Sequence, residues 1–463
     1  MKKLFFLFVG AALLTYSCSQ PAPQKEVNPV LSIEGGQIQG VMNADSTVLI
    51  YKGIPYAAAP VGELRWKKPQ PVVAWEGVKV ADQFGNAAMQ SAHDPNDGSY
   101  GTEFYAEDPA FSEDCLFLNV WTPENVAGDD KASLPVAMWV HGGAYSAGWG
   151  HEITMDGEAW AKKGVILVTI NYRLGIFGFL SHPELSAENN GISGNYGLYD
   201  QIAALKWVKN NIAQFGGDPE NITIFGQSAG GGSIRNLVIS PLSRNLMKKA
   251  IIQSAGGLGE FIPTQGTNQE GYDAEGKEIM DMGGYKTLEE MRAAPATDLM
   301  GLVGKYMAEK HKFLMLAPHT DGQVLTEDFA TATYNKDIAD IPYMLGYTSN
   351  DMMDMSEQQI KFATVRDSLS NQPTYCYLFN RPLPTDGRKS LEGAFHSSEL
   401  WYVFNTLDRS WRPFTEADHQ LSEEMVTAWT NFCKFGNPNG EKEGAWKPST
   451  KEAPFTFEFK IKE

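Results

Sequence analysis

The stretch Ile222-Thr223-Ile224-Phe225-Gly226-Gln227-Ser228-Ala229-Gly230 decides the fold of this chain. A run of apolar and β-branched residues leads into a G-x-S-x-G pattern, which is typical of a buried strand that turns sharply into a helix. The two glycines let the backbone bend closely enough to raise one hydroxyl above the sheet. The pattern therefore predicts that Ser228 is a nucleophile at the carboxyl end of a strand.

A second glycine-rich turn reads HGGAYSAG over residues 141–148 and follows the apolar run 134–140. Acyl transfer places negative charge on a carbonyl oxygen, and backbone N–H groups fixed in such a turn can stabilise that charge. Gly143, Ala144 and Ala229 are the candidate donors of this oxyanion hole.

Strand and helix patterns alternate around these motifs. Residues 165–171 form a continuous apolar run, as in a strand covered on both faces. Residues 199–215 carry apolar side chains at positions 202, 205, 208 and 212, which is helical spacing, and the GGDP turn at 216–219 ends that helix. The alternation predicts a mostly parallel sheet between helices, with the ligand at the carboxyl ends of the strands.

Together these motifs resemble the type-B carboxylesterases, the group of α/β-hydrolases that includes the cholinesterases. Further stretches match that family in chain order: YKGIPYA (51–57), PVGELRW (60–66), EDCLFLNV (113–120), NYRLG (171–175) and FGGDP (215–219). The resemblance runs from about residue 30 to residue 438. It implies an α/β-hydrolase fold, with a mostly parallel central sheet and helices on both faces, and hydrolysis of carboxylic esters through a serine.

A serine hydroxyl needs a base to take its proton, and the base needs an acid to orient it. In this fold the chain order is Ser, then Asp or Glu, then His. The histidines that follow the candidate nucleophile are His311, His319, His396 and His419. His396 lies in GAFHSSEL (393–400), which is similar to the family's catalytic-histidine segment. The other three are interpreted as surface or turn residues.

The acid is expected in the segment GYTSNDM at 346–352, whose family counterpart carries a Glu. Asp351 occupies the Glu position and is the candidate acid, and Asp354 is the alternative three residues further on. Ser254, in the QSAG sequence at 253–256, matches a family serine that supports the acid, so we expect it behind the triad.

Two departures from the family bear on the substrate. Gln227 replaces the Glu of the cholinesterases, which removes a carboxylate that would favour cationic substrates. Only 45 positions separate Asp351 from His396, and the shorter interval implies a reduced helical wall over the active site. We expect an open cleft for bulky esters, such as hydroxycinnamoyl or acetyl esters of plant-wall oligosaccharides, unless residues 94–108 close over it.

Three aromatic residues near the motifs, Trp149, Trp401 and Tyr402, could stack on a substrate ring, although packing in the core is the simpler interpretation. A different class of function also fits the family, which contains adhesion proteins that kept the fold and lost the triad. A non-catalytic envelope binding protein is therefore the alternative. The retained Ser228, His396 and HGGA turn favour the enzyme.

The N-terminus is typical of an export signal. Met1-Lys2-Lys3 is basic, and residues 4–14 are apolar but too few to span a bilayer. Cys18 follows the small residue Ser17, as in bacterial lipoproteins, so we expect a signal peptide at 1–17, a lipid on Cys18, a flexible tether at 18–29 and the esterase domain at 30–463. Plain secretion with an incidental cysteine is the alternative. Either way the protein is exported, and with the lipid it stays in the cell envelope, periplasmic or on the surface.

The remaining cysteines, Cys115, Cys376 and Cys433, are odd in number. The resemblance implies a disulfide from Cys115 to the position of Ala88, so this disulfide is expected to be absent and Cys115 to be a small buried hydrophobe. No metal-ligand spacing occurs, and neither a metal nor another cofactor is expected.

The composition, with 463 residues, 43% hydrophobic and 20% charged, fits one large domain, and no internal repeat divides the chain. The formal charge of −18 becomes −20 when Lys2 and Lys3 are removed with the leader. This charge argues against nucleic acid or an anionic membrane surface as a partner. The expected partner is a small-molecule or oligosaccharide-linked ester, with membrane contact only through the lipid anchor.

Overall fold

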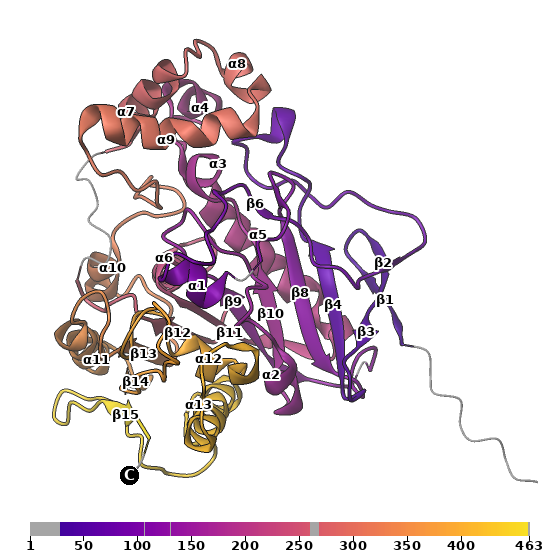
Figure 1. Ribbon diagram of the computed structural model, residues 1–463, viewed down its shortest axis with the longest axis vertical. Coiled ribbons are helices and arrows are strands. Elements are labelled where there is room, and N and C mark those ends of the chain that lie inside the picture. Colours follow the sequence, from indigo (N-terminus) through magenta and orange to yellow (C-terminus); the bar gives the residue numbers. More distant parts are fainter. Residues whose placement is uncertain (1–27, 106, 130, 260–267, 462–463) are drawn as a thin grey trace, which may run out of the picture.

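A ten-stranded sheet forms the centre of the fold, in the order β15-β14-β13-β12-β11-β9-β10-β8-β4-β3 (Figure 1). The computed structural model describes residues 28–105, 107–129, 131–259 and 268–461. The predicted leader, Cys18 and nearly all of the tether lie outside this part of the chain. From β10 and β9 through to β15 neighbouring strands pair in parallel, whereas β8, β4 and β3 pair antiparallel at one end.

The strands of the central sheet are β3 (Val41–Met42), β4 (Val48–Pro55), β8 (Phe117–Pro123), β9 (Leu134–Val140), β10 (Ile166–Ile170), β11 (Gly217–Gln227), β12 (Lys249–Gln253), β13 (Tyr343–Thr348), β14 (Thr374–Phe379) and β15 (Phe457–Phe459). Two small sheets contain β1 (Val30–Ile33), β2 (Gly36–Gln39) and β5 (Val78–Val80), and β6 (Ala87–Ala88) with β7 (Phe111–Ser112).

The α-helices are α1 (Tyr100–Phe104), α2 (Glu158–Lys162), α3 (Gly175–Phe179), α4 (Pro183–Glu188), α5 (Tyr196–Asn211), α6 (Ala229–Ile239), α7 (Gln269–Met282), α8 (Leu288–Ala293), α9 (Ala296–Lys310), α10 (Phe329–Asn335), α11 (Ser356–Leu369), α12 (Leu400–Val403) and α13 (Glu416–Phe435). Short 3₁₀ turns are η1 (Gly62–Leu64), η2 (Ile212–Phe215) and η3 (Leu407–Arg409).

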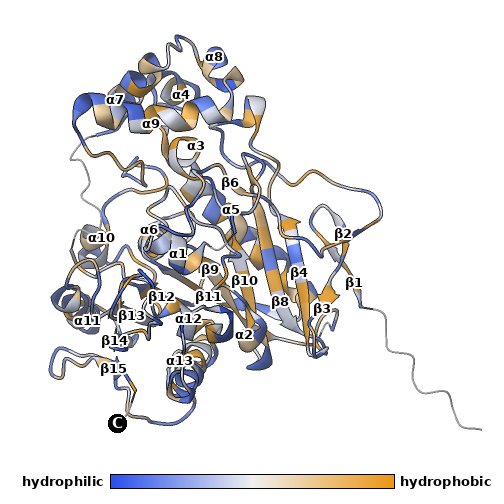
Figure 2. Ribbon diagram, in the orientation of Figure 1, coloured by the Kyte–Doolittle hydropathy of each residue, from blue (hydrophilic) through white to orange (hydrophobic). Residues whose placement is uncertain are grey.

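Alternation along the strands explains why both faces of the sheet are buried. In β9, Val136, Met138 and Val140 point into one apolar cluster, and Ala137 and Trp139 point into another. Successive side chains of a strand face opposite sides, so an apolar residue at every position requires a cover on each side. Figure 2 shows the strands at the centre predominantly in the hydrophobic colour.

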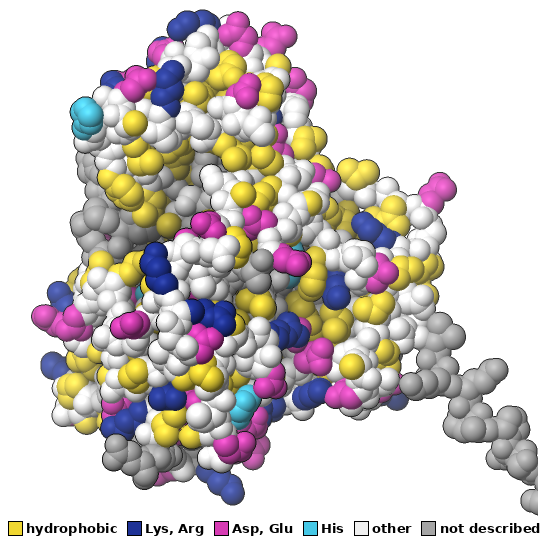
Figure 3. Space-filling view, viewed as in Figure 1, with side chains coloured by type: hydrophobic (Ala, Val, Ile, Leu, Met, Phe, Trp, Pro, Cys, Tyr) yellow, Lys and Arg dark blue, Asp and Glu magenta, His cyan; other side chains and the backbone are white. Residues whose placement is uncertain are grey.

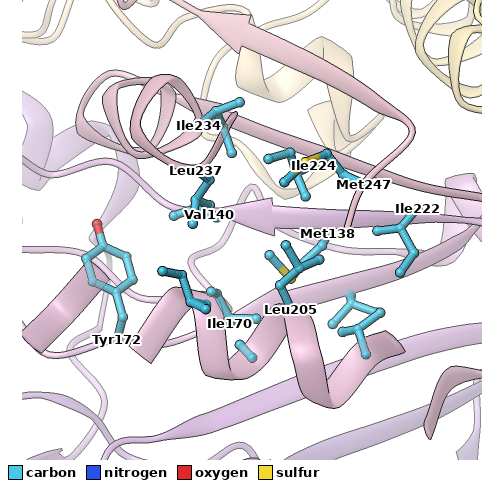
Figure 4. Packing of buried hydrophobic residues seen from close by; sticks show 14 of the residues in the cluster. Met138, Val140, Ile170, Tyr172, Leu205, Ile222, Ile224, Ile234, Leu237 and Met247 are labelled. Atoms are coloured by element: carbon cyan, nitrogen blue, oxygen red, sulfur yellow. The ribbon is translucent and has the colours of Figure 1, made fainter. Parts of the chain in front are cut away.

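Helices on both faces provide that cover. Leu205 of α5 and Leu237 of α6 pack against one face, as Figure 4 shows for the residues around β9 and β11. Trp160 of α2 and Trp429 of α13 pack in the cluster on the other face. Helices α7 to α9 lie at the top of Figure 1, and with α3 and α4 they enclose a third apolar cluster. The predicted three-layer arrangement is confirmed.

Local predictions hold with one shift of boundary. The strand expected at 165–171 is β10, and the helix expected at 199–215 is α5 followed by η2. That helix begins three residues earlier than predicted, because its first turn buries Tyr196 and Leu198, which lie outside the regular apolar spacing. Among the described residues, no helix combines the length and hydropathy needed to cross a bilayer.

Candidate active site

Ser228 lies at a sharp turn between β11 and α6, as the sequence predicts. It adopts a φ of 57°, which is unusual for a residue with a side chain and costs on the order of 1–3 kcal/mol. A Cβ on Gly226 would lie 2.6 Å from the backbone of Gly230, and one on Gly230 would collide with the carbonyl oxygen of Val140. Both glycines are therefore required by close backbone packing. The Ser228 N–H donates to Gln253 O at 2.9 Å, which fixes the turn to β12.

His396 and Asp351 meet although they come from different loops. The ring atom Nδ1 of His396 lies 2.6 Å from Asp351 Oδ1, and the two side chains are 5% and 1% exposed. The second oxygen of Asp351 accepts hydrogen bonds from the N–H and the hydroxyl of Thr348, both at 3.1 Å. Burial raises the pKa of Asp351, but the hydrogen bonds from His396 and Thr348 outweigh it and hold the pKa below its ordinary value. The carboxylate is thus charged and oriented.

A backbone contact sets the register of these two loops. Asn350 pairs with Phe395 in an isolated parallel bridge, and the Asn350 side chain accepts from Ala394 N at 3.1 Å. This places Asp351, next in the chain, opposite His396. Asp354 is exposed instead and accepts a hydrogen bond from Ser356 N at the start of α11. Of the two acids left open by the sequence, Asp351 is the one in contact with His396.

The other ring nitrogen of His396 contacts a residue to which the sequence gave no role in the triad. The side-chain amide of Gln227 donates toward His396 Nε2 at 3.2 Å, and both side chains are buried. With Nδ1–H donated to Asp351, Nε2 carries the lone pair that accepts this bond. Within the described residues, Nε2 is thus bonded to Gln227 and not to the adjacent Ser228. Only the position of Gln227 beside the nucleophile could have signalled this contact.

The candidate oxyanion turn packs directly on the nucleophile. A Cβ on Gly142 would lie 3.2 Å from Ser228 Cβ, so this glycine permits close approach. Gly143, Ala144 and Tyr145 have φ values of 95°, 54° and 57°, a left-handed run that aligns successive N–H groups. The N–H groups of Gly143 and Ala144 have no acceptor among the described residues.

Ala229 adds a third N–H group to this turn. As the first residue of α6, it has an N–H that the helix itself does not satisfy, at the positive end of the helix dipole. The three predicted donors therefore lie in two segments that pack together beside Ser228. Their role in catalysis stays a prediction.

Two further buried groups lie behind the dyad. The Ser254 hydroxyl lies close enough to Asp351 to help lower the pKa of that carboxyl, although within the described part of the chain it makes no hydrogen bond of good geometry. Glu399 follows His396 by three residues and is fully buried. Burial, and then the charge of Asp351, raise the pKa of Glu399 to about 7. The sequence analysis did not single out Glu399, because nothing in its pattern signals burial.

The wall over the site includes the segment that the sequence analysis held in reserve. Tyr100 of α1 presents its ring edge-on to His396 at a centroid distance of 6.5 Å. Glu103 anchors α1 through a fully buried ion pair with Arg412 at 2.8 Å. The interval between the dyad residues holds only α11 and β14. Ser228 remains partly exposed beneath this short wall.

The aromatic residues considered for stacking have other surroundings. Trp401 and Tyr402 are fully buried and Trp149 is 3% exposed, so core packing is confirmed and a stacking surface from Trp401 or Tyr402 is wrong. Cys115 is free and buried, and it lines a small cavity together with Ala88. The family's disulfide is thus replaced by an apolar contact region, as expected.

An apolar cavity of about 310 Å³ opens beside the oxyanion turn. Ala144 and Ser146 line one side, and Met300, Met307 and Leu316 line the side below α9. In Figure 3, hydrophobic side chains gather where the α7–α9 helices meet the rest of the molecule. Flexible methionine side chains can adapt to apolar groups of different shapes.

Comparison with known proteins agrees with this geometry. The carboxylesterase family matches over residues 27–372 and 358–463, and the chain belongs to that family. It is 38% identical to the fumonisin B1 esterase of Sphingopyxis macrogoltabida, over 89% of this chain and 83% of that protein. It is 33% identical to the para-nitrobenzyl esterase of Bacillus subtilis, over 89% and 91% of the two chains.

Solved structures of esterases share the fold. A thermophilic para-nitrobenzyl esterase superposes with a TM-score of 0.81 at 29% identity, covering 93% of this chain and 96% of that one. The predicted α/β-hydrolase fold is therefore confirmed, and the chain is a carboxylesterase that hydrolyses carboxylic ester bonds. This outcome favours the enzyme over the non-catalytic binding protein.

Proposed function

We propose that the protein cleaves esters through an acyl-enzyme on Ser228, with His396 as general base and Asp351 as the acid that orients it. The observation that carries the proposal is the 2.6 Å contact between His396 Nδ1 and Asp351, made at the loops beside the Ser228 turn. An ionised acid on Nδ1 leaves Nε2 free to accept a proton and stabilises the imidazolium that results.

The reaction follows from these positions. Ser228 Oγ attacks the ester carbonyl while its proton passes to His396 Nε2, and the tetrahedral oxyanion accepts hydrogen bonds from the N–H groups of Gly143, Ala144 and Ala229. Collapse breaks the ester C–O bond, and His396 returns the proton to the departing alcohol. Water then attacks the acyl-enzyme by the same route and releases the acid.

Gln227 has to yield during the first step. His396 Nε2 carries one lone pair, and in the resting arrangement that lone pair accepts the Gln227 amide at 3.2 Å. The Ser228 hydroxyl must replace this amide before its proton can move. Gln227 therefore acts as a positioning residue that holds the ring between turnovers.

The proposed substrates are bulky esters, with sugar-linked hydroxycinnamoyl or acetyl esters as one class. The short wall between Asp351 and His396 and the partial exposure of Ser228 support this choice. The apolar cavity of about 310 Å³ offers room for a ring or an aliphatic chain. Relatives named for fumonisin B1 and para-nitrobenzyl esters are consistent with large substrates.

A direct assay tests the mechanism. Hydrolysis of 4-nitrophenyl acetate should be easily measured for the native protein and lost in Ser228→Ala, which removes the attacking oxygen and little volume. A panel of short-chain, long-chain and hydroxycinnamoyl esters then ranks the acyl groups. Turnover that persists in folded Ser228→Ala would overturn the mechanism.

We also propose that the enzyme is a lipoprotein of the cell envelope. Ser17-Cys18 after the apolar leader supports a lipid on Cys18, and the Pro- and Gln-rich residues up to 29 suit a tether. The anchor would leave the acidic body of the protein free of the membrane surface.

A further inference from the structure

A second cavity, of about 490 Å³, lies on the other side of the oxyanion turn. Tyr145, which follows Ala144 in that turn, lines it, and so does Gly232 of α6. Gly232 is four residues after Ser228, about one helical turn or ~6 Å along the axis. The cavity thus begins close to the nucleophile, although neither the sequence nor the proposed mechanism gives it a role.

Arg235 brings a buried positive charge to the wall of this cavity. Its side chain is in a residue only 7% exposed, and its guanidinium donates to Ala255 O and Gly259 O, both at 2.8 Å. The ring of Phe329 lies 4.6 Å beneath it. Gly259 and Phe329 line the same cavity, so the contacts hold the guanidinium at its wall.

The charge of Arg235 is not neutralised by the described residues. No carboxylate of residues 28–259 or 268–461, apart from the two single-residue gaps, forms an ion pair with it. Carbonyl oxygens satisfy N–H groups but supply no counter-charge, and burial accordingly lowers the pKa of Arg235 to about 10. A buried cation without a counter-ion is costly, and a bound anion would relieve that cost.

Other charged groups on the cavity do not cancel this field. Lys361 is exposed and adds a second positive charge to the lining. Asp328 caps α10 by accepting from the N–H groups of Ala330 and Thr331 at 2.9 Å, and Glu327 accepts from Asn335 at 2.9 Å. Both carboxylates are thus held by other donors.

We propose that Arg235 binds a carboxylate carried on the acyl part of the substrate, so that the preferred esters are half-esters of dicarboxylic or polycarboxylic acids. This inference rests on the proposed function, because it needs the acyl group on Ser228. Arg235 is seven residues along α6, about two turns or ~10 Å, and helical side chains lean back toward the N-terminus. An acyl chain of a few carbons spans the remaining gap, and a guanidinium pairs well with a terminal carboxylate.

The test compares two matched esters, 4-nitrophenyl hydrogen adipate and 4-nitrophenyl hexanoate, whose acyl chains have equal length. The measured quantity is the ratio of their kcat/KM values after subtraction of spontaneous hydrolysis. We expect the native enzyme to prefer the adipate, and Arg235→Gln to lower the ratio at least tenfold. Arg244→Gln, which removes an exposed charge paired with Asp337, is the matched control and should leave the ratio within twofold.

The outcomes separate the subsite from the mechanism. A ratio unchanged in Arg235→Gln, with hexanoate turnover that needs Ser228, would overturn the subsite and leave the proposed function standing. Hexanoate turnover independent of Ser228 would overturn the proposed function itself. Glu260 follows Gly259 and lies outside the described residues, so Glu260→Gln is included. A tenfold rise of the ratio in that variant would show that Arg235 is already paired, and would overturn the subsite.

A measurement on the native enzyme covers the case in which Arg235→Gln does not fold. Free adipate should inhibit hexanoate hydrolysis competitively, and the neutral adipamide should inhibit at least tenfold more weakly. Equal inhibition by the two compounds would overturn the proposal, because recognition would then not depend on charge.

Discussion

Replacing Glu399 by Gln should stabilise the protein in alkaline solution. Glu399 is fully buried behind the dyad, with one oxygen 3.4 Å from Gln253 Nε2 and the other without a partner among the described residues. Burial and the nearby charge of Asp351 raise its pKa from 4.5 to about 7. A neutral amide of the same shape removes the need to ionise this site.

The sign follows from proton binding. In the unfolded chain the Glu399 carboxyl ionises near 4.5 and in the folded protein near 7, so between these values the folded state holds more protons. Stability is therefore full below pH of about 4.5, falls as pH rises toward 7, and stays low above it. The pKa difference of about 2.5 corresponds to roughly 3 kcal/mol, an upper limit for what Glu399→Gln restores at pH of about 8.

Urea unfolding from pH of about 5 to about 9 measures this effect as the difference between variant and native free energies. That difference should grow with pH and level off above about 7. Glu152→Gln is the matched control, because burial raises the pKa of Glu152 to about 8, so its difference should level off at higher pH. A Glu399→Gln curve that stays parallel to the native curve over the whole range would refute the reasoning.

Three further predictions address the dyad, the wall and the anchor. Asp351→Asn should lower kcat roughly 10²- to 10⁴-fold because the charge that stabilises the imidazolium is lost, whereas Asp354→Asn should change it less than about twofold; steady-state kinetics would show a reversed order if the loop register is wrong. Tyr100→Ala removes the ring edge-on to His396, so kcat/KM for a sugar-linked ester should rise relative to a small aryl ester; an unchanged ratio would mean that α1 does not restrict the alcohol. Cys18→Ser should release the protein from the envelope fraction and abolish labelling by a fatty-acid analogue; native protein that is soluble and unlabelled would support plain secretion.

The fold was predictable because its signals are local. A glycine on each side of Ser228 and a continuous apolar run into it specify a strand-to-helix turn through sterics alone. Burial of both faces of β9 and β10 likewise follows from apolar residues at successive positions. The helix start at Tyr196 was missed because burial of its first turn depends on tertiary neighbours.

The site was predictable only in part. The choice between Asp351 and Asp354 depends on the bridge from Asn350 to Phe395, a contact between loops that sequence spacing does not reveal. The Gln227 contact with His396 likewise joins residues 169 positions apart. Which way such side chains point is set by packing across the sheet.

Arg235 illustrates the same limit on a helix. Its position seven residues after Ser228 places it two turns along α6, but only the folded chain shows that it lines a cavity beside Tyr145. Glu399 is similar, since its polar neighbours Ser397 and Ser398 would suggest an exposed loop and all three are buried. Buried charges near a reactive serine are therefore the features that most need the structure.

The central claim is that Ser228 forms the covalent intermediate. A fluorophosphonate probe mimics the tetrahedral species and should transfer one phosphonyl group to each chain, which peptide mass mapping locates. The account predicts a single label on the peptide that contains Ser228, and none on folded Ser228→Ala. A label on another residue, or an active native enzyme that takes no label, would contradict it.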